Sequence, residues 1–324
     1  MTSTLVRVEG SAGVDDARLA AVVGAEAAHL DDVERAHAGE VAAALATNVC
    51  RAGGSGVVLV RPVGDVTGRY VEILAIDRGA PLDEPEAALQ PAAALSAEFD
   101  AWSAPAEGAV VVSRVGRVAA LRCEVGAVSV PFPGETECGD GYFLEVAGAR
   151  ARLAVVDGLG HGHDAAEATR AAIGALSRMG GRPLAAVMEE LHEALRRTRG
   201  AAVGLGDVDF AAHTLEWIGI GNIAGSVPDR DGTLRGVASY NGIVGHNVRG
   251  LQSMPYSWGQ RGHAVFHTDG VSSTWVRARY PGVQQHHPAI FAGLIFRDHC
   301  RGRDDATVLV VRERRPDLRE AVHE

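Results

Sequence analysis

The sequence has few cysteines, no long apolar run and no N-terminal targeting pattern, and each shortage excludes a class of protein. Its four cysteines among 324 residues lack the spacing of a metal site or a disulfide framework. No segment contains the 18 or more apolar residues of a membrane-spanning helix. The N-terminus lacks the basic start and apolar core of a signal peptide. We therefore expect a protein of the reducing cytoplasm that does not contact membranes.

Basic residues are also fewer than acidic ones. The chain has 31 Lys and Arg residues and 41 Asp and Glu residues, which gives a formal net charge of −10. This acidic balance argues against a nucleic-acid-binding protein and against attachment to an anionic membrane. The remaining composition is typical of a globular protein, since 47% of the residues are hydrophobic and 22% are charged. A chain of 324 residues is long enough for two domains with separate cores.

The first third of the chain predicts two helices and several strands. Helices are expected over 15–30 and 31–51, because each range opens on paired Asp residues suited to a helix N-terminus. A turn-rich loop over 62–68 suggests a hairpin. Strands are expected over 57–61, 70–76 and 109–118. Together these elements predict an α/β domain over residues 1–120.

Two segments of this half resemble the histidine-kinase-type ATPases, in the form found in small cytoplasmic serine kinases and anti-sigma factors. Leu45–Asn48 matches the family's helix, and the resemblance implies that Asn48 binds the magnesium of ATP. Ala75–Gly79 matches the family's adenine-binding turn, which implies that Asp77 bonds the adenine amino group and that Gly79 adjoins the nucleotide. The implied fold is an α/β sandwich.

The same half departs from that family at positions that hold the triphosphate. Ala44 stands where the family has an acid, and Pro81 stands where it has a glycine. No glycine-rich lid occurs over 82–109, although such a lid wraps the triphosphate with backbone N–H groups. We expect weak or no ATP binding and no kinase activity. These departures favour a degenerate docking or regulatory domain that retains the sandwich.

The second half is organised around the stretch LAVVDGLGHGHDAAEAT over 153–169. An apolar run over 153–156 predicts a buried strand, and an Ala-rich segment from Asp164 predicts a helix. Between them, Asp157 is followed by three glycines that let the backbone bend and expose carbonyl oxygens. A hard cation could then be bound by side chain and main chain together. For the Asp-Gly pair alone, a plain turn is the alternative.

Several acidic positions share one sequence context, because each adjoins a predicted strand and lies next to glycine or another acid. These positions are Asp140, Asp157, Asp269 and the pair Asp304 and Asp305. Each position alone also fits an ordinary turn. Together they form an oxygen-only ligand set of the kind that holds two hard divalent ions, which acidify a shared water and neutralise a phosphoryl group. The sequence therefore predicts a metal centre for phosphate-ester chemistry.

Residues 122–312 resemble the metal-dependent serine/threonine protein phosphatases of the type 2C superfamily, in the bacterial sporulation-and-stress branch. The matching motifs are Gly139–Asp140, Val156–Gly162, His267–Gly270 and Asp304–Thr307. The resemblance implies an α-β-β-α sandwich over residues 121–315, followed by a tail over 316–324. It also implies two manganese or magnesium ions. The fold class expected for the whole chain is α+β.

The phosphatase resemblance implies a role for each acid. Asp157 bridges both ions. The carbonyl of Gly158 and the side chain of Asp269 serve one ion, and Asp140 and Asp304 serve the other. The four aspartates, Asp140, Asp157, Asp269 and Asp304, are therefore the expected catalytic residues.

Three further positions bear on the phosphate ester. Leu159 occupies the place where larger eukaryotic members have a histidine, so no general acid is expected there. Those members also grip phosphate with an arginine near the domain start, and only Arg122 has a comparable position in this chain. His161 lies beside the acids in sequence. We assign it a role in the loop, and contact with phosphate is the alternative.

These resemblances predict a metal-dependent phosphatase that acts on phosphoserine or phosphothreonine in proteins. The implied substrates are phosphorylated STAS-domain or stressosome proteins of a sigma-factor pathway, and the first domain implies a docking surface for anti-sigma-pathway proteins. Two other functions remain open. One is a binding protein, a pseudokinase joined to a pseudophosphatase, that titrates such a partner. The other is a functional kinase in the first domain that opposes the phosphatase.

Overall fold

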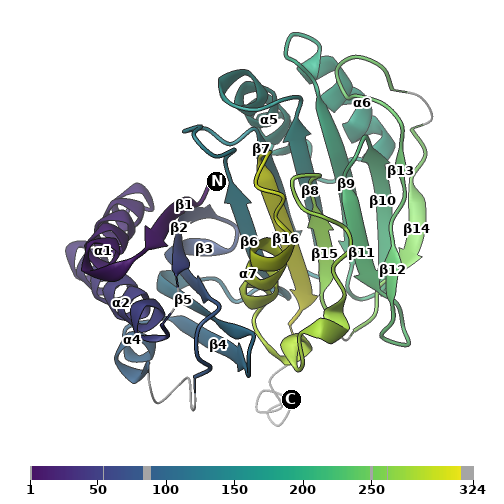
Figure 1. Ribbon diagram of the computed structural model, residues 1–324. Coiled ribbons are helices and arrows are strands. Elements are labelled where there is room, and N and C mark those ends of the chain that lie inside the picture. Colours follow the sequence, from purple (N-terminus) through teal and green to yellow (C-terminus); the bar gives the residue numbers. More distant parts are fainter. Residues whose placement is uncertain (1, 54, 83–88, 249–250, 261, 315–324) are drawn as a thin grey trace.

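The computed structural model describes residues 2–53, 55–82, 89–248, 251–260 and 262–314, and the predicted tail over 316–324 lies outside them. Within these ranges the chain forms three β-sheets and the helices that cover them (Figure 1). The mixture of helix and strand agrees with the predicted fold class. No helix in the described ranges is long and apolar enough to cross a membrane.

Two long helices cover one face of the first sheet, and the sequence explains where the second one begins. α2 (Asp32–Arg51) follows Asp31, whose side chain accepts hydrogen bonds from the backbone N–H groups of Val33 and Glu34. The Glu34 side chain accepts the N–H of Asp31 in return, which completes a capping box. α1 (Gly10–Ala27) has no such cap and begins at residue 10 rather than at the predicted residue 15.

The first sheet is antiparallel and has the order β1-β2-β3-β5-β4. Its strands are β1 (Thr4–Val8), β2 (Gly56–Asp65), β3 (Gly68–Asp77), β4 (Glu98–Ala104) and β5 (Gly108–Val118), and the short helix α4 (Gln90–Ala94) precedes β4. The predicted loop over 62–68 is therefore mostly strand. Pro62 is tolerated there because the pairing of β2 with β1 ends at Val60, so its missing N–H removes no bond on that side.

Two further sheets form the second domain. One has the order β13-β10-β9-β8-β7 with β14 beside β10, and the other has the order β12-β11-β15-β16-β6. The strands of the first are β7 (Asp140–Ala147), β8 (Arg150–Gly158), β9 (Ala201–Asp209), β10 (Thr214–Ile220), β13 (Ser239–Tyr240) and β14 (Met254–Ser257). The strands of the second are β6 (Cys123–Val130), β11 (Ala224–Pro228), β12 (Leu234–Gly236), β15 (Ala264–His267) and β16 (Ala306–Glu313).

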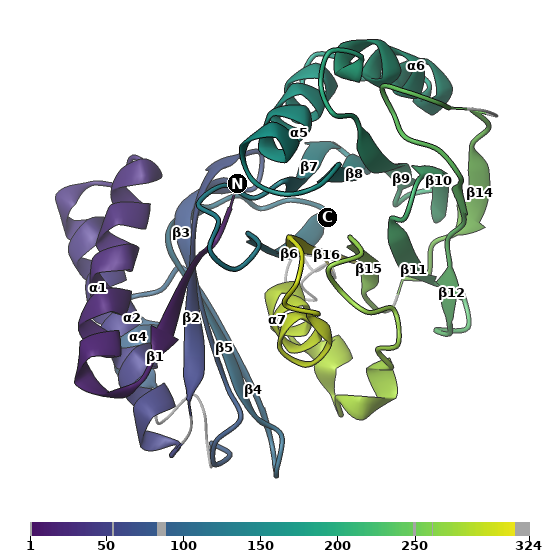
Figure 2. The ribbon, with the colours of Figure 1, turned by 45° about the horizontal axis from the view of Figure 1, so that its top comes forward.

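These two sheets pack face to face and carry helices on their outer sides (Figure 2). The core between the sheets includes Leu153, Trp217, Phe266 and Leu309, all fully buried. α5 (His163–Leu176) and α6 (Leu184–Leu195) cover the sheet that contains β8 and β9. α7 (Pro288–His299) covers the sheet that contains β6 and β16. The second domain is therefore layered as helices, sheet, sheet, helix.

Helix α7 is shared by the two domains, because the first sheet lies against its other side (Figure 2). Gly293 allows the close approach, since a Cβ atom there would lie 3.0 Å from Val110 and 3.1 Å from Leu74 of the first sheet. Nine successive residues of α7, 288–296, are buried. A helix that is apolar all round needs cover on every side, and the first domain covers the side that the second domain leaves open.

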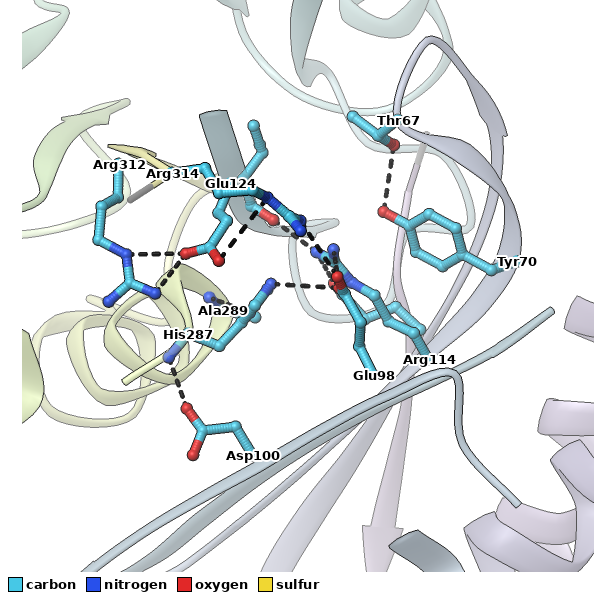
Figure 3. Close-up of polar contacts among 12 residues, drawn as sticks. Thr67, Tyr70, Glu98, Asp100, Arg114, Glu124, His287, Ala289, Arg312 and Arg314 are labelled. Atoms are coloured by element: carbon cyan, nitrogen blue, oxygen red, sulfur yellow. Dashed lines mark hydrogen bonds and ion pairs between the residues drawn. The ribbon is translucent and has the colours of Figure 1, made fainter. Parts of the chain in front are cut away.

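Charged side chains close the edges of this interface (Figure 3). Asp100 of β4 accepts the backbone N–H of His287 at 2.5 Å. Glu98 lies between Arg114 of β5 and Arg314, with oxygen–nitrogen distances of 3.0 and 3.2 Å. The contacts of Asp100 with His287 and of Glu98 with Arg314 join a strand of the first domain to a segment of the second, and Arg114 holds Glu98 from within the first sheet.

One ion-pair cluster is fully buried behind them. Glu72 of β3 accepts hydrogen bonds from Arg61 at 2.6 Å and from Arg114 at 2.7 Å, and all three side chains are at most 4% exposed. Both arginines also form hydrogen bonds to the second domain, since Arg61 donates to the Tyr142 hydroxyl and Arg114 donates to the Val125 carbonyl. The two domains thus share a polar core as well as an apolar one.

Candidate metal centre

The predicted acids come together where strands of both sheets in the second domain end. Asp140 opens β7 and lies opposite Asp157 of β8 in the antiparallel register. Asp269 follows β15, and Asp304 and Asp305 immediately precede β16. β15 and β16 are neighbours, and the N–H of Thr268 donates to the carbonyl of Thr307 across them. The fold therefore gathers residues from four strand ends on one rim.

Glycines allow this convergence because several backbone segments pass too close for side chains. A Cβ atom on Gly270 would lie 1.9 Å from the carbonyl oxygen of Asp305, and one on Gly158 would lie 2.2 Å from the carbonyl of Ala165. A Cβ atom on Gly139 would lie 2.7 Å from a carboxylate oxygen of Asp305. The Asp-Gly and Gly-Asp pairs of the sequence motifs are thus a packing requirement of the site.

Neighbouring polar groups fix the orientation of three acids. Asp140, 5% exposed, accepts the hydroxyl of Thr268 at 2.5 Å. Asp269 accepts the side-chain amide of Asn222 at 2.6 Å. One oxygen of Asp305 accepts the backbone N–H of Phe132 at 2.8 Å, while its other oxygen is buried with no hydrogen-bond partner among the described residues.

The sequence had assigned no role to Thr268 or Asn222. Thr268 lies inside a matched motif, His267–Gly270, but its contact with Asp140 joins segments 128 residues apart. Asn222 follows Gly221, which has φ +89°, so a glycine-asparagine pair after a strand was the available signal. Both residues hold a carboxylate in place and leave its remaining oxygen lone pairs available.

The carboxylates of the site repel one another electrostatically. Burial, and then the charges of Asp269, Asp304 and Asp305, raises the pKa of Asp157 to about 8. Burial and the charge of Asp157 raise the pKa of Asp140 well above its usual range. The pKa values of Asp304 and Asp305 are also raised, in each case chiefly by burial.

No Lys, Arg or His within the described ranges forms an ion pair with any of these five acids. Uncompensated carboxylates of this number favour a bound cation, and an all-oxygen set suits manganese or magnesium. No three His, Cys, Asp or Glu side chains of the described residues converge closely enough to enclose one ion. Main-chain carbonyls and water would therefore complete the ligand shell, as is usual for hard cations.

The loop after Asp157 carries two histidines that point to acids outside this group. His161 is 2.9 Å from Glu135 and stacks on Phe132 with ring centroids 4.5 Å apart. His163 is 3.0 Å from Glu137. These contacts fit the predicted loop role of His161. Leu159, which replaces the histidine of larger relatives, is 49% exposed.

Arg122 lies at the wrong end of the sheet to grip a phosphate. It precedes β6 and forms an ion pair with Glu313 at 2.8 Å. The acids adjoin the opposite end of β6, where Val130 pairs with Ala306. Eight residues of strand separate the two ends by roughly 25 Å. Arg122 is near the acids' domain in sequence, but β6 runs from Arg122 toward them, so the whole strand separates the two.

In the first domain, the residues of the ATPase resemblance lie in different surroundings. Asn48, on α2, lines a cavity of about 430 Å³ together with Ala44 and residues of α1 and α4. Asp77 is buried at the end of β3, is not part of that lining, and accepts the N–H of Gly79 at 2.8 Å. Burial raises its pKa. Nucleotide binding by Asn48, Asp77 and Gly79 stays a prediction.

Comparisons with known proteins agree with the architecture of the second domain. No family model matches the chain. In sequence, the chain is 21% identical over 145 residues to the phosphoserine phosphatase RsbX of Bacillus subtilis, covering 45% of this chain and 73% of that protein.

Solved structures give the same result. A chain described with the bacterial stressosome, a modular system adapted to control secondary messenger signalling, is 28% identical with a TM-score of 0.55, over 59% of this chain and 99% of that one. RsbX in complex with magnesium is 19% identical with a TM-score of 0.52, over 58% of this chain and 94% of that one. The PP2C phosphatase domain of SpoIIE from Bacillus subtilis, with a fragment of its regulatory domain, is 20% identical with a TM-score of 0.50, over 78% and 81%.

These similarities confirm the predicted likeness to PP2C-type serine/threonine phosphatases, and the predicted enzyme class agrees with that of the relatives. The resemblance of the first domain to histidine-kinase-type ATPases is outside what they test and stays a prediction.

Proposed function

We propose that this chain removes phosphate from phosphoserine or phosphothreonine side chains of proteins, with two manganese or magnesium ions. One observation carries the proposal: five acids from four strand ends converge, two of them buried and three partly exposed, without an ion-paired cation among the described residues. A partly buried cluster of this kind is stable at neutral pH when a divalent cation balances its charge. The magnesium bound by the solved relative RsbX supports the same choice of ion.

Asp157 is the proposed shared ligand, and Asp140, Asp269, Asp304 and the Gly158 carbonyl supply the other protein oxygens. Bound ions of this type acidify a shared water and neutralise charge on the phosphoryl group. The chain's own contribution is orientation, because Thr268 and Asn222 each hold one carboxylate by a side-chain hydrogen bond. Since Leu159 offers no proton, the departing serine or threonine oxygen takes its proton from solvent.

The proposed substrates are phosphorylated STAS-domain or stressosome proteins, and other proteins of an anti-sigma pathway are further proposed partners. The support comes from the relatives, one of which is the phosphoserine phosphatase RsbX and another of which belongs to work on the stressosome. The test is to incubate the pure protein and Mn²⁺ with a panel of serine-phosphorylated STAS-domain proteins. Binding without turnover of any of them would favour the titrating protein instead.

Activity is expected to vanish with chelator and to return with Mn²⁺, and its pH dependence follows from the raised pKa of Asp157. Below about pH 8 that carboxyl group holds a proton in the metal-free protein, so an ion must displace the proton to bind. The manganese concentration for half-maximal rate should rise as the pH falls, by up to about tenfold per unit for each proton displaced. Hydrolysis of a small aryl phosphate, titrated with Mn²⁺ between pH 5.5 and 9, measures this.

At saturating Mn²⁺ the rate should rise from mildly acidic pH and level off in the weakly alkaline range, because no side-chain acid follows Gly158. His161→Ala serves as the comparison variant. A bell-shaped profile that peaks near pH 6 and collapses in this variant would assign acid–base work to His161 and contradict its role in the loop.

For the first domain we expect ATP to bind weakly or not at all, with no phosphate transfer to protein. The reasons are the alanine at position 44 and the placement of Asp77 outside the cavity lined by Asn48. Isothermal titration calorimetry with ATP and Mg²⁺ measures the affinity, with Asn48→Ala as the comparison. Micromolar binding that Asn48→Ala and Asp77→Asn both abolish would establish a working nucleotide site.

A further inference from the structure

The chain contains no lysine, so all 31 of its basic side chains other than histidine are arginines. A phosphoryl dianion that enters a site rimmed by carboxylates is held more tightly when a cationic side chain also donates to its outer oxygens. Arg122 is excluded by its place at the far end of β6. An arginine that binds phosphate here must therefore lie beside the loop that follows Asp157.

Arg199 occupies a turn between α6 and β9 that is tied to this loop. The backbone N–H of Leu159 donates to the carbonyl of Gly200 at 3.0 Å. The carbonyl of Arg199 itself is 2.9 Å from the ring nitrogen Nε2 of His246. The hydroxyl of Thr198 donates to the carbonyl of Leu195 at 2.8 Å and accepts the N–H of Gly200 at 3.0 Å. The turn is thus held from both sides.

The guanidinium of Arg199 lies over Gly160. Its Nη1 atom is 3.1 Å from where a Cβ atom on Gly160 would stand, and its Nη2 atom is 2.6 Å from the carboxylate of Asp164. The carbonyl of Gly160 faces Gly139, which directly precedes Asp140. The side chain is half-exposed, and its Nε and Nη1 atoms make no hydrogen bond to another residue in the described part of the chain.

We propose that Arg199 binds the phosphoryl group of the substrate, with Asp164 orienting the guanidinium. This inference rests on the proposed phosphatase function. Asp164 contacts the guanidinium through Nη2 and leaves Nη1 to donate to a phosphate oxygen, a charge-assisted hydrogen bond of the kind that arginine makes to phosphate. Two other arginines, Arg301 and Arg303, flank the acids in sequence. Among the described residues no side-chain hydrogen bond or ion pair fixes the direction of either guanidinium, whereas Asp164 fixes that of Arg199.

The test compares Arg199→Gln with Arg196→Gln. Arg196 lies in the same turn and pairs with the exposed Glu193 at 2.9 Å, so it matches Arg199 in exposure and charge but not in position. With a phosphoserine peptide and saturating Mn²⁺, Arg199→Gln should raise KM by about 10- to 100-fold, the range expected for lost charge-assisted hydrogen bonds. The same variant should weaken inhibition by inorganic phosphate to a similar degree. Arg196→Gln should change both by less than about twofold.

Asp164→Asn separates binding from a structural role, because it breaks the same ion pair while sparing the arginine. If the pair only stiffens the loop, Asp164→Asn and Arg199→Gln should have equal effects, and the proposal fails. Under the proposal, the amide oxygen that Asp164→Asn retains still accepts from the guanidinium and orients it, so the phosphate affinity stays within about threefold of wild type. Equal manganese half-saturation in all variants shows that the metal centre is intact.

Two further results would overturn the assignment. A rise in KM for the peptide with unchanged inhibition by inorganic phosphate would mean that Arg199 contacts the peptide and not its phosphoryl group. If the wild-type protein has no turnover, the phosphatase function fails, and calorimetric titration of inorganic phosphate with Mn²⁺ still decides on Arg199. Equal phosphate affinity of wild type and Arg199→Gln in that titration would remove the proposed site.

Discussion

Asp157→Asn is expected to lower kcat/KM for phosphate-ester hydrolysis by at least about 100-fold, while the fold stays intact. The side chain is the proposed shared ligand, and burial, followed by the charges of three other acids, raises its pKa. Asparagine has one oxygen and no charge, so it can serve neither as a bridging ligand nor as a balance for two dications. Loss of a metal-held nucleophile removes several kcal/mol of transition-state stabilisation.

The matched control is Asp209→Asn, at the other end of the same strand pair. Asp209 of β9 lies opposite Arg150, the first residue of β8, whereas Asp157 lies opposite Ala202. Both variants lose one carboxylate from the same sheet, but only the first touches the proposed site. Hydrolysis of an aryl phosphate with added Mn²⁺, together with thermal unfolding, gives the comparison. Retention of more than about a tenth of wild-type activity by Asp157→Asn would contradict the bridging role.

Glu72→Ala is expected to destabilise the protein by about 3–5 kcal/mol, the range for removal of one member of a buried ion-pair cluster. Burial disfavours the charged form of Glu72, but Arg61 and Arg114 outweigh it and lower its pKa. The substitution would leave two guanidinium groups buried between the domains with no carboxylate between them. Urea unfolding at neutral pH measures the difference from wild type.

The control is Glu193→Ala, which breaks the exposed pair with Arg196 and should lower stability by no more than about 1 kcal/mol. The sign of the pH effect is a further check. Because the folded-state pKa of Glu72 is lowered, its stabilising effect is present above the unfolded-state pKa of about 4.3 and is lost as the pH falls through the folded value. The difference in unfolding free energy between wild type and Glu72→Ala should therefore become smaller in acid. A loss below about 1 kcal/mol at pH 7 would contradict the shared polar core.

Local patterns predicted the parts of this structure that local chemistry decides. The helix start at residue 31 follows from a capping box, and the strand before Asp157 follows from its apolar run. The start of α1 at Gly10 has no side-chain cap, so its position depends on packing against the first sheet. The strand pairing around Pro62 likewise depends on where β1 ends.

The candidate site was predictable as a set of residue types but not as a geometry. The five acids could be selected because each adjoins a strand and a glycine or another acid. Which acids are oriented by Thr268 and Asn222 depends on contacts between segments far apart in the chain. The misplaced Arg122 shows the same limit, since sequence distance from a motif does not give the direction of a strand.

The shared helix α7 also has a consequence for how the chain is made. The first sheet is complete once β5 has left the ribosome, but the helix that covers its Leu74 and Val110 side chains spans 288–299. At about 5–20 residues per second, the interval between the two is roughly 10–35 s. During that time a valine- and leucine-rich sheet face remains in contact with water or with a chaperone. A nascent chain stalled before residue 288 should therefore aggregate, although its first domain is already synthesised in full.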